Sequence, residues 1–384
     1  MTSASYSSAA AEPFEGLRIR GVAKTFGTDT TVLNEIDLDV HPGELISLVG
    51  SSGTGKSTLL RIIAGLEEPS AGRVTYAGQP LERGSVGVVF QRPILYPHLS
   101  VKDNILFPTR LGAFAGRVDA DYYRELLEAL KLEGLESRKP SQLSGGQAQR
   151  VGIARALIRR APVVLFDEPL ASVDEQMSAS IRADIVRLHE RYGFTGLYVT
   201  HDQNEALMLG QRVAVMDAGY LVQVDTPERL LAHPHTLQVA KLLAAPALNL
   251  LNLEDSESLP AGCELAIRAT ALCPVAADAA HGLPVQVLGS RHLVGGMLYR
   301  GRLLDAVSLP LESRRASVDS EPSDRVYARV RAGQELEFFI PDVQSATLSG
   351  ASPNSTFLSV GERVHLGVAA ERCFLFSGGK RFYL

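Results

Sequence analysis

A glycine-rich segment followed by a lysine and two hydroxyl residues has the spacing of a phosphate-binding loop. Its sequence, GSSGTGKST, comprises Gly50, Ser51, Ser52, Gly53, Thr54, Gly55, Lys56, Ser57 and Thr58. Glycines let backbone N–H groups approach phosphate oxygens, and the positive end of a following helix dipole favours the anion. Lys56 would reach the β- and γ-phosphates, and the Ser57 hydroxyl would ligate Mg²⁺. We therefore expect a nucleoside triphosphate bound with magnesium.

Two carboxylates end a hydrophobic run at positions 163–168 (VVLFDE). Such a run predicts a buried strand of a parallel sheet, whose carboxyl end reaches the nucleotide crevice. We expect Asp167 to hold Mg²⁺ through water. Taken alone, Glu168 could instead complement a helix N-terminus. His201, which follows the next predicted strand, could be a buried structural histidine. Other motifs must therefore decide the roles of these two residues.

A third motif separates the classes of phosphate-binding proteins, because kinases, GTPases, helicases and transport ATPases all cradle a triphosphate. Residues 143–147 read LSGGQ and are followed by AQRVGIARAL. This string resembles the signature of ABC ATPases. The resemblance implies that Ser144 and the N–H groups of Gly145 and Gly146 hold the γ-phosphate of ATP bound to a second subunit. It also includes Gln147 in the ATP site.

The same resemblance assigns roles to residues outside the signature. Glu168 would be the general base that polarises the attacking water, and His201 would contact the γ-phosphate and link two subunits. Gln91, in VVFQRP, would be the Q-loop glutamine that reaches magnesium and water. Asp174 keeps the last position of the LASVD segment, whereas Ala171 replaces the family's serine. The lost hydroxyl removes one cross-subunit hydrogen bond of about 1 kcal/mol, so we expect an altered rate rather than lost activity.

The adenine contact is predicted from one aromatic residue. Phe26, in KTFG, stands where the family places a ring stacked on the base, a contact that tolerates any flat base. Phe26 could instead be a core residue of its strand, and Tyr198 and Tyr76 remain open as other contacts. The base contact is thus less specific than the phosphate contacts.

These residues require strands and helices that alternate along the chain. Alternating or continuous hydrophobic runs predict strands over residues 17–26, 32–40, 44–50, 163–168 and 195–202. Helical spacing predicts helices over residues 57–66, 122–135, 147–160 and 178–192. This order predicts an α/β fold with a largely parallel sheet covered on both faces. The expected class is a P-loop NTPase of ABC type, for which the resemblance implies a helical subdomain.

Composition along the chain predicts two folded domains. We expect a flexible tail over residues 1–16, an ABC ATPase domain over 17–245 and a small all-β domain over 246–384, where short alternating runs replace helical spacing. Residues 263–274 and 361–376 resemble paired segments of the OB-like TOBE domain of maltose-type importer ATPases. The family's Arg-Pro-Glu is here Arg268 followed by Ala269 and Thr270, so a regulatory contact and a purely dimer-widening role both stay open.

Charge and cysteine content narrow the partners. A formal net charge of -5 offers no basic patch for nucleic acid, so we expect none as a partner. Three unpaired cysteines in the last third of the chain suit a reducing cytoplasm. No stretch reaches the roughly 18 apolar residues of a membrane span. Any membrane role is therefore expected to come through a partner.

The resemblance implies the ATP-hydrolysing motor of a bacterial solute importer, acting as a homodimer. Transmembrane permease subunits and, indirectly, a solute-binding protein are the expected partners, at the cytoplasmic face of the cell membrane. Residues 96–105, 138–147 and 246–251 look most like carbohydrate or glycerophosphate systems. Polyamine, ferric-iron and sulfate importers share the architecture. The alternative of another class is a soluble ABC ATPase of DNA repair or the ribosome, and an exporter motor is a second alternative.

Overall fold

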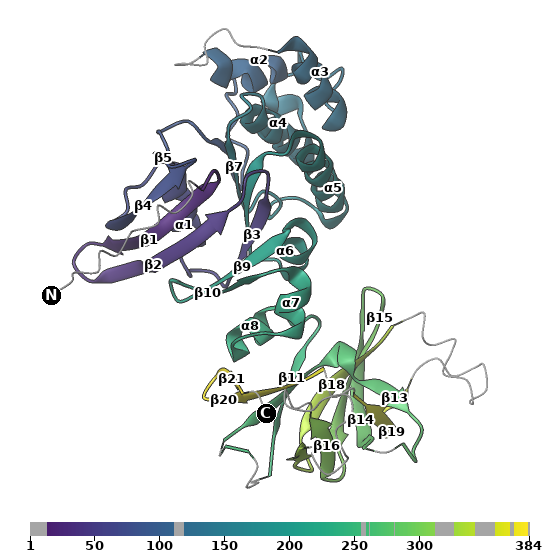
Figure 1. The fold of residues 1–384 in the computed structure, drawn as a ribbon. Coiled ribbons are helices and arrows are strands. Elements are labelled where there is room, and N and C mark those ends of the chain that lie inside the picture. The colour runs from purple at the N-terminus through teal and green to yellow at the C-terminus, as the bar shows by residue number, and fades with distance from the viewer. Residues whose placement is uncertain are drawn as a thin grey trace, which may run out of the picture. The chain divides into compact units, whose positions relative to one another are not determined.

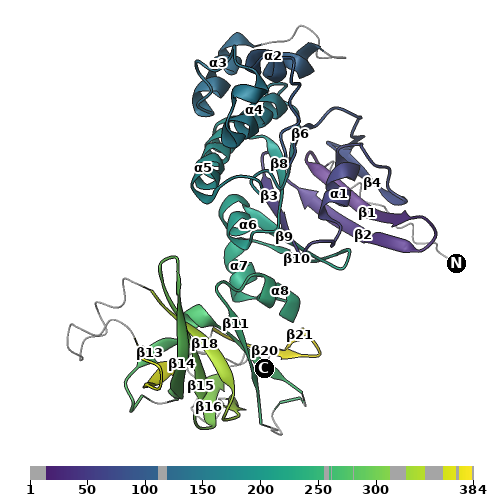
Figure 2. The same cartoon turned by 180° about the vertical axis from the view of Figure 1, so that it is seen from behind.

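The computed structural model forms two compact units, residues 1–227 and 228–384 (Figures 1 and 2). It describes residues 14–110, 119–254, 259–260, 262–279, 281–311, 326–341, 358–368 and 372–382. Most of the predicted N-terminal tail lies outside the described residues. Each unit has its own hydrophobic core, so each can be described separately.

A six-stranded, mainly parallel sheet lies at the centre of the first unit. Its strand order is β10-β9-β3-β8-β7-β6, with β3 (Leu45–Val49), β6 (Gly87–Val89), β7 (Val163–Asp167), β8 (Thr195–Thr200), β9 (Arg212–Asp217) and β10 (Tyr220–Asp225). Only β10 runs antiparallel to its neighbour. Val49 pairs with Thr200, and Asp167 pairs with Val199. The carboxyl ends of β3, β7 and β8 therefore meet at one edge, as predicted.

A second, antiparallel sheet packs on the same core through helix α1. Its order is β2-β1-β4-β5, with β1 (Leu17–Phe26), β2 (Thr30–Val40), β4 (Ala71–Tyr76) and β5 (Gln79–Pro80). Helix α1 (Lys56–Ile63) buries Leu59 in a cluster shared with Ile19 of β1 and Leu48 of β3. The apolar side of this helix thus packs against residues of both sheets, which holds its first turn against the end of β3.

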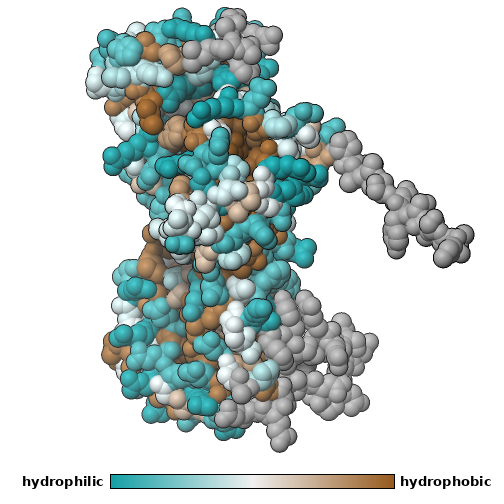
Figure 3. All heavy atoms as spheres, turned by 90° about the vertical axis from the view of Figure 1, so that its left-hand side faces the viewer, coloured by the Kyte–Doolittle hydropathy of each residue, from teal (hydrophilic) through white to brown (hydrophobic). Residues whose placement is uncertain are grey.

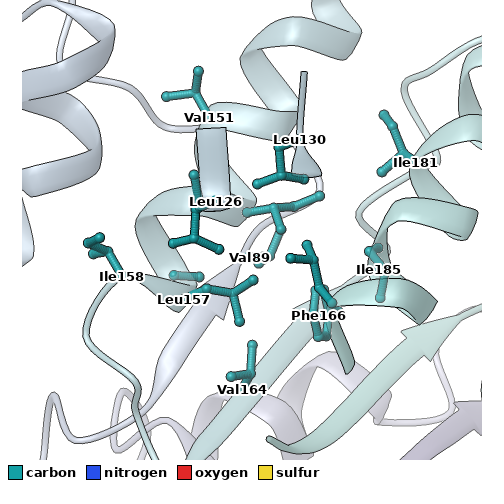
Figure 4. Packing of buried hydrophobic residues seen from close by; sticks show 14 of the residues in the cluster. Val89, Leu126, Leu130, Val151, Leu157, Ile158, Val164, Phe166, Ile181 and Ile185 are labelled. Carbon is teal, nitrogen blue, oxygen red and sulfur yellow. The ribbon is translucent and has the colours of Figure 1, made fainter. Parts of the chain in front are cut away.

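The remaining helices of the first unit are α2 (Val101–Leu106), α3 (Ala120–Ala129), α4 (Gly145–Leu157), α5 (Glu175–Tyr192) and α6 (Gln203–Leu209). In both ribbon views α2, α3 and α4 gather at the end away from β1 and β2. Figure 4 shows how α3, α4 and α5 pack on β6 and β7: Leu126, Leu157 and Ile185 surround Phe166 and Val89. This cluster connects the helical part to the parallel sheet.

Helix ends differ from the predicted ranges where side-chain caps decide them. Helix α3 ends before Leu130, and the positive φ of Lys131, 55°, cannot continue a helix. Helix α4 begins two residues earlier than predicted because Ser144 and Gln147 form a reciprocal capping box. Helix α5 begins at Glu175 because the Asp174 side chain accepts the N–H of Met177. Hydrophobic spacing alone does not register such caps.

The second unit is mainly antiparallel β structure. One sheet has the order β11-β12-β20-β21, another β13-β19-β14-β15-β18, and a third pairs β16 with β17. The strands are β11 (Leu248–Asn252), β12 (Glu264–Arg268), β13 (Cys273–Val275), β14 (Leu283–Leu293), β15 (Gly296–Leu303), β16 (Val307–Leu311), β17 (Val326–Val330), β18 (Glu335–Pro341), β19 (Arg363–Gly367), β20 (Cys373–Ser377) and β21 (Lys380–Phe382). The prediction of a C-terminal all-β region is confirmed.

Two short helices, α7 (Pro227–Ala232) and α8 (Leu237–Leu242), begin the second unit. Leu237 and Ala240 of α8 share a buried cluster with Ala266, Phe374 and Phe376 of the first sheet in that unit. The boundary between the two compact units falls between residues 227 and 228, and the domain division after residue 245 stays a prediction from composition. Helical residues that pack on the β-sheet of the second unit have the same composition as helical residues of the preceding α/β domain.

The face in Figure 3 mixes hydrophilic residues with small hydrophobic areas. Within the part of the chain that the structure describes, no helix is both long and apolar enough to cross a bilayer.

Candidate nucleotide-binding site

The predicted phosphate loop connects the buried strand β3 to helix α1. Gly53 and Gly55 have φ angles of 82° and 100°, conformations that favour glycine. Gly50 is required by crowding instead, because a Cβ there would lie 2.3 Å from the carbonyl oxygen of Met216. The loop thus turns sharply and presents backbone N–H groups at the start of α1, which is what a phosphate chain requires.

The Lys56 side chain folds back onto this loop and hydrogen-bonds to it. Its ammonium donates to the carbonyl oxygens of Gly50, at 2.8 Å, and Ser51, at 3.0 Å. Burial lowers the pKa of Lys56, and the nearby carboxylates of Glu168 and Asp167 act in the opposite direction. An ammonium has three N–H donors, so one remains beyond the two loop carbonyls. Lys56 is therefore at the loop, near both predicted carboxylates.

Ser57 and Asp167 lie together although 110 positions separate them. The Ser57 hydroxyl donates to Oδ1 of Asp167 at 3.2 Å. Burial raises the pKa of Asp167, and the Ser57 hydrogen bond opposes that rise. Within the described residues there is no cluster of three or more His, Cys, Asp or Glu side chains suited to a metal. Two neighbouring oxygens fit Mg²⁺, which keeps several waters and binds substrate phosphates rather than an all-protein cage.

Glu168 and His201 form the next pair along the same sheet edge. Oε2 of Glu168 lies 2.9 Å from Nδ1 of His201, with the side chains 22% and 55% exposed. A carboxylate accepts hydrogen bonds, so in this pair an N–H at Nδ1 of His201 donates to Glu168. Glu168 has a positive φ of 44°, and its N–H donates to the Val199 carbonyl at 2.9 Å. This turn directs Glu168 off the end of β7. Lys56, Ser57, Asp167, Glu168 and His201 are hereafter the phosphate-loop cluster.

The signature residues lie at the start of α4. The Ser144 hydroxyl accepts the N–H of Gln147 at 3.3 Å, and the Gln147 side chain accepts the N–H of Ser144 at 3.0 Å. A Cβ on Gly146 would lie 2.6 Å from Cγ of Met177, whereas one on Gly145 would meet nothing within 4 Å. The structure therefore explains Gly146 by packing, but it leaves Gly145 facing open space.

Asp174 belongs with the signature residues. Its side chain accepts the N–H of Met177 at 2.9 Å, and Met177 is the residue that packs on Gly146. Ser144, Gly145, Gly146 and Asp174 are hereafter the signature cluster. In the described part of the chain, no hydrogen bond joins Ser144, Gly145 or Gly146 to the phosphate-loop cluster. One chain thus contains two separate sets of predicted phosphate ligands.

Gln91 is exposed just after β6, in a segment that α4 holds. Gln149 of α4 donates to the Phe90 carbonyl at 3.2 Å, and Arg155 donates to the Ile94 carbonyl at 2.6 Å. Among the described residues Gln91 has no hydrogen bond to Ser57 or Asp167. The predicted magnesium contact of Gln91 therefore stays a prediction.

The three aromatic candidates for the adenine contact have different environments. Phe26 ends β1 with 43% of its surface exposed, and the Lys24 ammonium lies 4.9 Å from its ring centre. Tyr198 is fully buried. Tyr76 lines a hollow with Pro162 and Thr195, which flank the starts of β7 and β8, so it lies at the opposite edge from the phosphate loop. Phe26 is the candidate that remains available to a base.

Sequence reasoning missed a buried polar group behind His201. It comprises Tyr198, Thr200, Glu205 and Arg182, linked by hydrogen bonds and an ion pair. Nothing in the spacing of these residues marks them, because Arg182 comes from another helix.

Comparisons with known proteins agree with the fold and the motifs. The family model described as ABC transporter matches residues 33–171. The chain is 42% identical over 266 residues to the sn-glycerol-3-phosphate import ATP-binding protein UgpC of Salmonella typhi, covering 66% of this chain and 74% of the relative. The chain belongs to the ABC transporter ATP-binding proteins, as the signature motif predicts.

Two further similarities show how much of the chain resembles known ABC proteins. The sn-glycerol-3-phosphate import ATP-binding protein UgpC 1 of Rhizobium johnstonii is 45% identical over 241 residues, which cover 61% of this chain and 65% of that protein. The solved structure of cbiO1 from Clostridium perfringens, described as part of the ABC transporter complex cbiONQ, has a TM-score of 0.52 and 27% identity. It covers 58% of this chain and 92% of that chain. The match to UgpC 1 thus spans just under two thirds of that relative.

Proposed function

We propose that this chain is the ATP-hydrolysing motor subunit of an ABC importer and works as a homodimer. The observation that carries the proposal is the Glu168–His201 pair, 2.9 Å apart, beside the Ser57–Asp167 pair at the end of the phosphate loop. A carboxylate that can accept a proton thus neighbours residues suited to a triphosphate and Mg²⁺. This arrangement suits phosphoryl transfer to water.

In this proposal the loop N–H groups and Lys56 hold the β- and γ-phosphates of ATP, and Phe26 stacks on adenine. Ser57, Asp167 and Gln91 hold Mg²⁺, which supplies neutralisation of the charge that develops on the phosphate oxygens. Glu168 accepts a proton from water as the water oxygen bonds to the γ-phosphorus. The bond from that phosphorus to the bridging oxygen then breaks, giving ADP and inorganic phosphate. His201, held by Glu168, contacts the γ-phosphate.

A second copy supplies the other half of each site. Gly145 faces open space, and the described hydrogen bonds leave the signature cluster apart from the phosphate-loop cluster of its own chain. An isologous dimer brings each signature cluster to the partner's phosphate loop and forms two equal sites. ATP then holds the dimer closed until hydrolysis, with Asp174 and Gln147 at the interface.

Transmembrane permeases are the proposed partners at the cytoplasmic face of the cell membrane, with a solute-binding protein acting through them. The segment after Gln91 supports this docking, because α4 fixes its backbone while the Ile94 side chain is 65% exposed. The names of the relatives support sn-glycerol-3-phosphate, or another solute of the glycerophosphate or carbohydrate class, as the imported solute. This motor would not touch the solute itself.

Substitution of the general base tests the proposal. Glu168→Gln keeps the side-chain volume but removes the proton acceptor, so ATP hydrolysis should fall roughly 10²- to 10⁴-fold. The variant should elute as a dimer in ATP by size-exclusion chromatography with light scattering. Glu128→Gln is the matched control, because that side chain is exposed on α3, outside both clusters. Undiminished hydrolysis by Glu168→Gln, or monomers at saturating ATP, would contradict the proposal.

A further inference from the structure

Glu205 of α6 is a buried carboxylate whose two oxygens are both engaged. Oε2 accepts the hydroxyls of Thr200, at 2.8 Å, and Tyr198, at 3.1 Å. Oε1 lies 3.4 Å from the guanidinium of Arg182. The Glu205 side chain is 9% exposed, and burial keeps the pKa of Tyr198 well above its ordinary value, so its hydroxyl remains a donor. A buried carboxylate is costly unless such partners compensate it.

The hydrogen bonds of this group involve Thr200 and Asp202, the residues directly before and after His201. The Thr200 hydroxyl donates to Glu205 and also accepts the N–H of Asp202 at 3.0 Å. The Asp202 carboxylate in turn caps α6 by accepting the N–H groups of Asn204 and Glu205. One continuous set of hydrogen bonds therefore holds the residues on both sides of His201.

His201 itself has little packing to hold it. Its side chain is 55% exposed, and its contact to Glu168 is made by Nδ1 alone. The direction of an exposed ring depends on the backbone that carries it. Thr200 and Asp202 are both hydrogen-bonded to Glu205, so Glu205 restrains the backbone on either side of His201. This restraint adds to the bond from the Glu168 N–H to the Val199 carbonyl.

Arg182 extends the group to helix α5. Its guanidinium lies 3.4 Å from Glu205 and also 3.4 Å from Oε1 of Glu175. Glu175 is the first residue of α5 and follows Asp174 of the signature cluster. Arg182, itself a residue of α5, therefore contacts both Glu205 and the first residue of the helix that Asp174 caps.

We propose that Glu205 is a positioning residue, which through Thr200 holds the His201 loop so that the imidazole stays on Glu168. Arg182 fixes the second oxygen of Glu205 and aligns this loop with the start of α5. The role rests on the proposed ATPase function, in which Glu168 and His201 act on ATP. Glu205 touches neither nucleotide nor water in this assignment, and its effect passes through His201.

A pair of substitutions at Thr200 tests the role in the full-length protein. Thr200→Val keeps a branched side chain on β8 but removes the hydroxyl, whereas Thr200→Ser keeps the hydroxyl. Misplacing a catalytic group by about 1 Å can cost 10²-fold in rate, so we expect kcat for ATP to fall roughly 10- to 100-fold in Thr200→Val. Thr200→Ser should stay within about threefold of wild type, and ATP affinity should be unchanged in both. Equal kcat in the two variants would overturn the role.

A second measurement separates positioning from general destabilisation. In a His201→Ala background, Thr200→Val should lower kcat little further, because effects of residues that act as one unit are not additive. A full additional 10-fold loss there would overturn the role, since the hydroxyl would then act elsewhere. Glu205→Gln should reproduce Thr200→Val, with Glu128→Gln, an exposed residue of α3 outside both clusters, as the surface control. A wild-type chain without ATPase activity would instead overturn the proposed function, and this role with it.

Discussion

The phosphate-loop cluster and the signature cluster carry comparable polar groups but are held in opposite ways. In the first, Ser57 bonds to Asp167 and Glu168 bonds to His201, so its side chains already contact one another within one chain. In the second, Ser144 and Asp174 cap their own helices, and a Cβ added to Gly145 would meet nothing within 4 Å. The side chains of the phosphate-loop cluster hydrogen-bond to one another, whereas the signature cluster exposes the start of a helix.

This difference shows which half of the proposed site depends on a partner. Side chains that bond to one another are positioned by the fold of the single chain. A capped helix start that faces open space is positioned by its own chain, but the group that binds there must come from another molecule. The two regions together thus describe half of each of two sites, with the other half contributed by a second copy.

Mixing two inactive variants tests this division and has the largest expected effect. Lys56→Ala disables the phosphate-loop cluster, and Gly145→Asp places a carboxylate in the signature cluster, where the open space and the helix N-terminus tolerate it. Each variant alone should lose roughly 10²- to 10³-fold in ATP hydrolysis. An equal mixture should recover about a quarter of wild-type activity, since half of the dimers then contain one intact site.

The control for this mixture is Glu128→Gln, which changes an exposed side chain of α3 outside both clusters and should retain activity alone and mixed with wild type. Recovery is measured after the two purified variants have exchanged subunits. A mixture as inactive as its components would show that both clusters must come from the same chain.

An intermediate effect is expected from the buried ion pair that anchors the signature helix. Arg150 of α4 lies 2.8 Å from Asp184 of α5, and the Asp184 side chain is 0% exposed. Asp184→Asn leaves the guanidinium buried without its charge partner, so the free energy of unfolding should fall by about 3 kcal/mol. Urea denaturation followed by circular dichroism measures this change in the first unit.

The matched control is Arg187→Gln on the same helix. Arg187 also contacts Asp184, but its side chain is 62% exposed, so this change should alter stability by less than about 1 kcal/mol. Equal losses in the two variants would mean that burial of the Arg150–Asp184 pair does not set the effect.

The smallest effect is a pH dependence of stability at the edge remote from both clusters. A ring nitrogen of His189 lies 3.0 Å from the Gly43 carbonyl, and burial lowers the pKa of His189 below its usual 6.5. Since the unfolded chain binds the proton more readily, the contribution of His189 is fully present above pH 6.5 and is lost as pH falls towards the lowered folded value.

Urea midpoints measured between pH 5 and 8, the range in which histidine titrates, check this sign. In His189→Gln the decline below pH 6.5 should be smaller than in the wild type. ATP affinity at pH 7.5 should be unchanged, because the residue contacts neither cluster. An identical decline in the variant would assign the acid sensitivity to other groups.

Much of the site follows from local pattern. The strand over residues 17–26 is confirmed to the residue, and the buried run before Asp167 forms the predicted parallel strand. Such agreement has a physical cause: a glycine-rich turn between a buried strand and a helix needs particular residues at particular spacings. The OB-like character of the second unit and the roles of the individual site residues remain predictions.

Other features depend on contacts between distant segments. Composition did not reveal that α8 packs on the β-sheet of the second unit, because its apolar residues suit either neighbour. Likewise Tyr198 was an open candidate for the base contact, and only the fold shows it buried against Glu205. A tyrosine within a strand gives the same sequence pattern whether its hydroxyl faces solvent or a carboxylate.

The sequence by itself determined the family, the phosphate loop, the carboxylate pair and the signature, because each is a short string whose chemistry requires consecutive residues. The tertiary structure alone decided that Glu168 meets His201, that Ser57 meets Asp167, and that the signature cluster stays apart from both. Those outcomes depend on strand order and helix packing, which bring together residues 33 and 110 positions apart. A contact across such distances is set by the whole core rather than by any segment of it.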